Sequence, residues 1–243
     1  TLAALMKYTV SASNADKRSE FAAKKKPGFF QSEMDIVADI WEKTGLSQGM
    51  RHPLAFVMEA CDDIAYSVID LEDACRKSVI SYADLKGHLE ASSCADDPVT
   101  QSVLEMCEQK RKQFKNLNLS AAESNDISMQ FFRVAAIAEM VKEVTRTFEE
   151  GLEEMLAASF EGSLITKSIV GEFCGVLKSF GKSHAYNHEA VRRVELEGHN
   201  AIMKVMDYLW SAISNRKDRE ALCSKRNTRS EERRVGKECR SRW

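Results

Sequence analysis

The chain has 243 residues, of which 44% are hydrophobic and 30% are charged, with 35 Lys or Arg against 37 Asp or Glu. This composition fits a globular protein with a substantial core and excludes a collagen-like, low-complexity or disordered chain. No apolar run reaches the roughly 18 residues of a membrane span, and the first residues lack the layout of a secretory signal. We therefore expect no membrane insertion.

The seven cysteines are odd in number and scattered, and they form no Cys-x-x-Cys pair. Neither a disulfide framework nor a cysteine-zinc site is indicated. A reducing, cytoplasmic setting is the simplest expectation.

The charge is uneven along the chain, because residues 216–243 carry eleven Lys or Arg against five Asp or Glu. A basic tail of this kind can bind nucleic acid. It has no apolar periodicity, however, and it resembles a translated vector or adapter stretch. We assign 1–215 to the helical portion and 216–243 to a tail that is disordered or a sequence artefact.

The first elements are read from their start and stop signals. Residues 1–7 look like the end of an apolar helix, which suggests that a part of the protein precedes them. A polar loop over 11–28 follows. Ser32 is placed to cap a helix through Trp41, which Gly45 ends.

The next helix is the best marked. Pro53 suits a first helical position, and apolar residues recur at threes and fours to about Val79. Ser81 then resembles the start of a capping box for a short helix ending near Glu90. The apolar positions of the long helix are Leu54, Val57, Met58, Cys61, Ile64, Ala65, Val68, Leu71 and Cys75.

Helices continue to the end of the patterned region. One begins at Pro98, residues 116–126 look like a connection, and a long helix runs from 127 to 148 and beyond. Two further helices cover 169–180 and 187–213. No alternating strand pattern competes with them, so the fold class is all-α. The predicted apolar stripe of the long helix is Phe131, Val134, Ile137, Ala138, Val141, Val144 and Phe148.

Asp62, Tyr66 and Asp70 are spaced by four residues on the well-marked helix. At about 100° per residue they form one stripe, at the rim of the apolar face. A carboxylate there is disfavoured unless a hydrogen bond or a cation compensates it, and a divalent metal is one such cation. The alternative is a solvated acidic edge.

The segment that runs from Arg51 to Asp73, which reads RHPLAFVMEACDDIAYSVIDLED, closely resembles the segment by which bacterial dGTP triphosphohydrolases of the HD superfamily are recognised. The resemblance implies an HD-domain-like helical bundle, of which this chain is the C-terminal part. Further similarity extends to about Arg219.

The resemblance also implies roles for the stripe. Asp62 would be the last ligand of the His, His-Asp, Asp centre that holds Mg²⁺ or Mn²⁺. Asp70 would accept a hydrogen bond from the 3′-hydroxyl of the substrate. Tyr66 would pack where a 2′-hydroxyl would lie, which favours deoxynucleotides.

Four further residues are placed by the same resemblance. Lys7 is a candidate phosphate contact, or else an exposed lysine at a helix end. Arg133 is a phosphate candidate for which we favour a surface salt bridge. Glu195 aligns with a guanine-recognising glutamate, since a carboxylate can pair with the N1-H and 2-amino edge, although a surface role is the alternative. Pro27 stands where the family often has an aromatic residue.

The sequence lacks the His-Asp pair of this metal centre, because none of its five histidines is followed by aspartate. His52 and His188 are therefore assigned capping or packing roles. Three metal ligands and the general acid/base histidine are expected upstream of Thr1, and no catalytic residue is assigned within this chain.

The resemblance implies metal-dependent hydrolysis of dGTP to deoxyguanosine and tripolyphosphate by a homo-oligomer, with the fragment itself inactive. One alternative is an HD phosphohydrolase that acts on other dNTPs or on a nucleoside monophosphate. Another is a non-catalytic helical module that binds single-stranded DNA or mediates oligomerisation.

Overall fold

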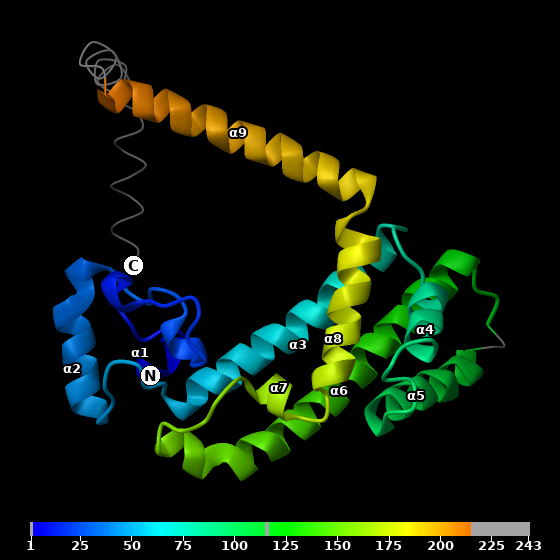
Figure 1. The fold of residues 1–243 in the computed structure, drawn as a ribbon. Coiled ribbons are helices and arrows are strands. Elements are labelled where there is room, and N and C mark those ends of the chain that lie inside the picture. The colour runs from blue at the N-terminus through cyan, green and yellow to red at the C-terminus, as the bar shows by residue number, and fades with distance from the viewer. Residues whose placement is uncertain (1, 115–116, 215–243) are drawn as a thin grey trace, which may run out of the picture. The chain divides into compact units, whose positions relative to one another are not determined.

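A computed structural model of the protein describes residues 2–114 and 117–214 (Figure 1). Over these ranges the regular elements are helices and no strand is formed, which confirms the all-α prediction. The chain divides into two compact units, residues 1–187 and residues 188–243.

The first unit contains eight α-helices and four short segments among its described residues. The short segments are the 3₁₀ turns η1 (Ala12–Asn14), η2 (Ala22–Lys24) and η3 (Gln31–Glu33), and the π-helical η4 (Gly181–Tyr186). The α-helices are α1 (Leu2–Leu5), α2 (Met34–Thr44), α3 (Pro53–Arg76), α4 (Tyr82–Glu90), α5 (Pro98–Phe114), α6 (Ala121–Leu156), α7 (Leu164–Lys167) and α8 (Gly171–Phe180).

The core of this unit lies around α3. This helix packs chiefly along α6, and α1, α7, α8 and η4 also contact it (Figure 1). Burial of apolar side chains from several helices in one cluster is the main stabilising contribution to such a bundle. The largest fully buried side chains include Phe132, Phe173, Phe180, Leu71, Leu85, Leu89, Met129, Met140, Leu164 and Leu177.

Several helix boundaries follow the signals in the sequence. Pro53 is the first residue of α3. The Ser81 hydroxyl accepts from the backbone N–H of Asp84 at 3.2 Å and closes the predicted capping box. Gly45, after the last residue of α2, has a φ of 70°, which a glycine adopts without strain.

The connection predicted over 116–126 is wrong in its second half. α6 begins at Ala121, because Ser120 and Glu123 form a capping box that the sequence reading missed. The Ser120 hydroxyl accepts from the backbone N–H of Glu123 at 3.2 Å, and the Glu123 carboxylate accepts from the backbone N–H of Ser120 at 2.8 Å. Two orphan N–H groups at the start of the helix are thereby satisfied.

The predicted apolar stripe of α6 matches the buried face only in part. Val134 is 59% exposed and Val141 is 46% exposed, whereas Phe132 and Met140 are fully buried. Small residues such as Ala135 and Ala136 also line the buried face, where they let neighbouring helices approach. The prediction was therefore wrong at Val134 and Val141, whereas Val144 is buried and Ile137 and Phe148 pack against the core.

The second unit is described only over α9 (Glu189–Ser214) and the residue before it. The predicted tail over 216–243 lies outside the described residues. None of the helices over residues 2–114 and 117–214 is long and apolar enough to cross a membrane. The large apolar side chains exposed on α9 are Val191, Val194, Leu196, Ile202, Met203, Val205, Met206, Tyr208, Leu209, Trp210 and Ile213.

The capping box of α6 gives the first testable prediction. Ser120→Ala should lower the free energy of unfolding by about 1 kcal/mol, since the N-cap acceptor is lost. Denaturant unfolding measures the change. Ser13→Ala removes an exposed serine hydroxyl that lies 2.9 Å from the Ser11 hydroxyl, and it should have little effect. Equal effects of the two substitutions would contradict the assignment of the cap.

Candidate active-site helix

The candidate site is built on α3, whose start is fixed by its N-cap. The Nδ1 atom of His52 accepts a hydrogen bond from the backbone N–H of Leu54 at 3.1 Å. The predicted capping role of His52 is therefore confirmed. His188 acts in the same way before α9, where its Nδ1 accepts from the backbone N–H of Ala190 at 3.3 Å.

Asp62, Tyr66 and Asp70 lie along one edge of α3, as predicted. Asp62 is exposed, Tyr66 is 58% exposed and Asp70 is partly buried. Glu59 and Asp63 extend the same side of the helix at about 100° per residue. We call Glu59, Asp62, Asp63, Tyr66 and Asp70 the polar face of α3.

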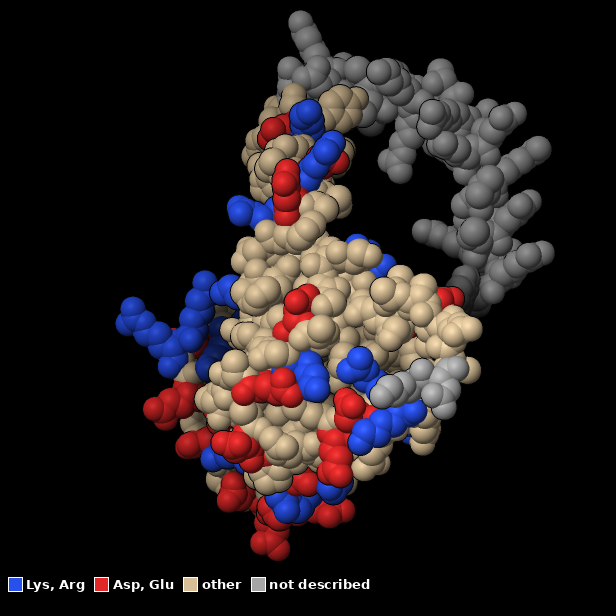
Figure 2. Space-filling view, turned by 90° about the vertical axis from the view of Figure 1, so that its right-hand side faces the viewer, with Lys and Arg blue, Asp and Glu red and all other residues tan. Residues whose placement is uncertain are grey.

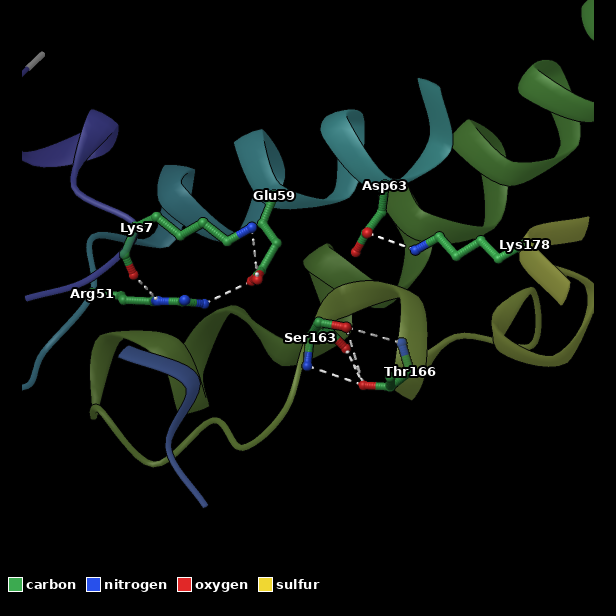
Figure 3. Close-up of polar contacts among 7 residues, drawn as sticks. All are labelled: Lys7, Arg51, Glu59, Asp63, Ser163, Thr166 and Lys178. Carbon is green, nitrogen blue, oxygen red and sulfur yellow. Dashed lines mark hydrogen bonds and ion pairs between the residues drawn. The ribbon is translucent and has the colours of Figure 1, made fainter. Parts of the chain in front are cut away.

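Lys7 and Arg51 meet the polar face at Glu59 (Figure 3). Lys7 Nζ lies 3.3 Å from one carboxylate oxygen of Glu59, and Arg51 Nη1 lies 2.7 Å from the other. The fold therefore brings Lys7 to the polar face of α3 at Glu59. Glu59 was missed in the sequence reading, although it lies three residues before Asp62.

Arg51 is deeply buried, since only 2% of its side chain is exposed. Its Nε donates to the backbone carbonyl of Lys7 at 2.6 Å, and its guanidinium lies 5.2 Å from the ring centroid of Phe56. A buried cation requires compensation, and the carboxylate of Glu59 provides it. The contacts among Lys7, Arg51 and Glu59 hold the segment after α1 against the first turns of α3.

Lys178 on α8 meets the polar face at Asp63, with 2.6 Å between Nζ and a carboxylate oxygen (Figure 3). Burial opposes the charged form of Lys178. The hydrogen bond to Asp63 and the charges of Asp63 and Asp62 outweigh it, so the pKa of Lys178 is raised. A fixed positive charge therefore lies beside the predicted metal ligand, and the sequence gave no local signal for it.

Tyr186, the last residue of η4, meets the polar face at Asp70. Its hydroxyl donates to a carboxylate oxygen of Asp70 at 2.6 Å. Its ring centroid lies 6.2 Å from that of Tyr66. Burial, followed by the hydrogen bond to Asp70, raises the pKa of Tyr186 well above its ordinary value. Tyr186 was also missed in the sequence reading, in which 181–186 was only a connection.

Arg133 is not brought to the polar face. Arg133 Nε lies 2.6 Å from a carboxylate oxygen of Glu72, which is the salt bridge that we favoured. Glu72 is two positions after Asp70 and so lies about 200° around α3. Glu195 belongs to α9 in the second unit, and its side chain is exposed.

The polar face offers carboxylate oxygens, the donors that Mg²⁺ and Mn²⁺ favour. Within the described part of the chain, no group of three or more His, Cys, Asp or Glu side chains is arranged to hold a metal ion. Asp62 fits as one ligand of a larger set.

The chain is 28% identical over 191 residues to the "Deoxyguanosinetriphosphate triphosphohydrolase" of Salmonella typhimurium, and 29% identical over 190 residues to that of Yersinia pestis. The chain is homologous to the deoxyguanosinetriphosphate triphosphohydrolases. The resemblance carried by the segment from Arg51 to Asp73 is thereby confirmed.

The match to these triphosphohydrolases covers 78% and 75% of this chain, but only 37% and 36% of the two relatives. The chain thus spans a little over a third of their length. No protein-family model matches it.

The ion pairs around Glu59 give the second prediction. Glu59→Gln should lower the free energy of unfolding by about 3 kcal/mol, because it leaves the buried guanidinium of Arg51 without a counter-charge. Adding Arg51→Met should recover part of the loss, which a double-mutant cycle measures by denaturant unfolding. Glu149→Gln, at an exposed position of α6, is the control. An effect at Glu59 no larger than that at Glu149 would contradict the account.

Proposed function

We propose that the chain forms part of a metal-dependent hydrolase that cleaves dGTP, and other dNTPs to an extent set by the base pocket, into deoxynucleoside and tripolyphosphate. The observation that carries the proposal is the polar face of α3. It presents Asp62, Tyr66 and Asp70 in one row, within the part of the chain that is homologous to the deoxyguanosinetriphosphate triphosphohydrolases.

Asp62 is the proposed metal ligand in this chain. A bound Mg²⁺ or Mn²⁺ would supply Lewis-acid polarisation of the α-phosphate. The sequence contains no His-Asp dipeptide, so we propose that residues outside this sequence provide the histidines, the second aspartate and the general acid/base. Lys178 adds positive charge beside Asp62 in a region that is to receive a triphosphate.

The sugar is proposed to lie along Tyr66 and Asp70. An ionised carboxylate has about four lone-pair sites, so the bond from Tyr186 leaves Asp70 able to accept from a 3′-hydroxyl. We assign the exposed ring of Tyr66 to pack against C2′, at the place where a 2′-hydroxyl would lie. This arrangement favours deoxyribonucleotides over ribonucleotides.

The phosphates and the base are assigned to two further residues. Lys7, with 31% of its side chain exposed beside Glu59, is the proposed phosphate contact, because it can turn from the carboxylate to an anionic ligand. Glu195 is the proposed guanine contact, since its carboxylate can accept from two N–H groups of that base.

Oligomerisation is the second proposed function, and the apolar side chains exposed on α9 favour it. Exposed apolar patches of this extent are typical of protein interfaces. Basic and acidic side chains are interspersed on the face shown in Figure 2, so this face does not favour binding of single-stranded DNA. Loss of salt-sensitive DNA affinity on deletion of 216–243 would favour that binding.

The third prediction tests the activity directly. The full-length protein with Mn²⁺ should release tripolyphosphate from dGTP, and Asp62→Asn should lower the rate at least about 100-fold, because a metal ligand is lost. Chromatography of the phosphate products separates tripolyphosphate from single phosphates. Asp96→Asn, at an exposed position in the loop before α5, is the control. Release of orthophosphate only, or no metal-dependent release, would refute the proposal.

A further inference from the structure

Tyr186 makes the one hydrogen bond to the Asp70 side chain that is found over the described residues. The 2.6 Å distance is short for a hydroxyl and a carboxylate, as expected when the acceptor is ionised. Phenol and carboxylate lie 116 positions apart in the sequence. The bond is therefore a product of the tertiary fold.

The local structure at Tyr186 is unusual. The helix that begins as α8 continues into the π-helical η4, and this change of winding alters the direction in which the following side chains point. π-Helical turns are rare, and they occur often at functional sites. Here the turn ends on the residue that bonds Asp70.

A glycine allows η4 to approach α3 this closely. A Cβ atom added at Gly181 would lie 3.2 Å from a methyl carbon of Leu71 and 3.7 Å from the ring of Tyr186. The packing at Gly181 and the hydrogen bond at Tyr186 thus hold the two ends of η4 against the same helix.

We propose that Tyr186 is a positioning residue, whose hydroxyl holds the Asp70 carboxylate in the orientation that receives the 3′-hydroxyl of the nucleotide. The inference rests on the proposed role of Asp70. It predicts that Tyr186 sets how strongly the protein prefers a substrate with a 3′-hydroxyl to a 2′,3′-dideoxynucleotide.

The chemistry of the pair supports this role. Because burial and the bond to Asp70 hold its pKa high, Tyr186 stays a protonated donor at every pH near neutrality. It donates one hydrogen bond to Oδ2, which leaves Oδ1 free to accept from the sugar. The ring of Tyr66 lies beside this phenol, with 6.2 Å between the ring centroids.

The kinetic test uses Tyr186→Phe in the full-length protein with Mn²⁺. The ratio of kcat/KM for dGTP to kcat/KM for dideoxy-GTP should fall about tenfold, because a misplaced Asp70 loses only the contact to the 3′-hydroxyl. The rate with dideoxy-GTP should change little. Tyr82→Phe removes a buried tyrosine hydroxyl on α4, and it should leave the ratio unchanged.

A spectroscopic test follows the hydrogen bond itself and needs no activity. Tyrosinate absorbance is followed during an alkaline titration. One tyrosine should ionise at a lower pH in Asp70→Asn than in the wild type. The titration of this tyrosine should be absent in Tyr186→Phe. Tyr186 has a raised pKa in the folded state, so its stabilising contribution is present below about pH 10 and is lost as the pH rises further.

The outcomes separate the two proposals. An active wild type whose substrate ratio is unchanged by Tyr186→Phe, or whose two rates fall in parallel, would overturn the positioning role alone. No hydrolysis of dGTP by the wild type would overturn the proposed function and the inference with it. No titration shift in Asp70→Asn would overturn the hydrogen bond.

Discussion

Burial of one side of α3 is the constraint on which the rest of the structure depends. Ile64, Val68 and Leu71 are almost fully buried in the core. Their position fixes the rotation of the helix about its axis, and so it fixes the direction of the polar face on the other side. Asp62 and Asp70 are therefore oriented by the hydrophobic packing behind them.

Each turn of the polar face is met by a donor from a different segment. The chain before α3 supplies cations to Glu59, α8 supplies Lys178 to Asp63, and η4 supplies Tyr186 to Asp70. Ion pairs of this kind add modest stability where they are exposed and constrain geometry where they are buried. We therefore infer that the chain before α3, α8 and η4 together hold the row of Asp62, Tyr66 and Asp70 in place.

Local signals made several helix ends predictable. Pro53, Ser81 and Gly45 act within one turn of a helix end, so their effects follow from neighbouring residues. The buried side of α6 was not fully predictable in this way, because Ala135 and Ala136 line it while Val134 is exposed. The side of a helix that is buried depends on the helices that pack against it. The sequence of one helix alone does not determine that side.

The candidate site was likewise predictable only where it depends on the residues of one helix. Spacing within one helix gave the row of Asp62, Tyr66 and Asp70, whereas the partners Lys178 and Tyr186 lie more than 100 positions away and carry no spacing signal.

The most direct measurement is a crystal structure of the full-length protein with Mn²⁺ and a non-hydrolysable dGTP analogue. The account predicts the 3′-hydroxyl within about 3.0 Å of the Asp70 carboxylate, the metal on Asp62 and the Tyr186 hydroxyl still bonded to Asp70. A nucleotide bound away from α3, or an Asp70 that contacts no part of the sugar, would contradict it.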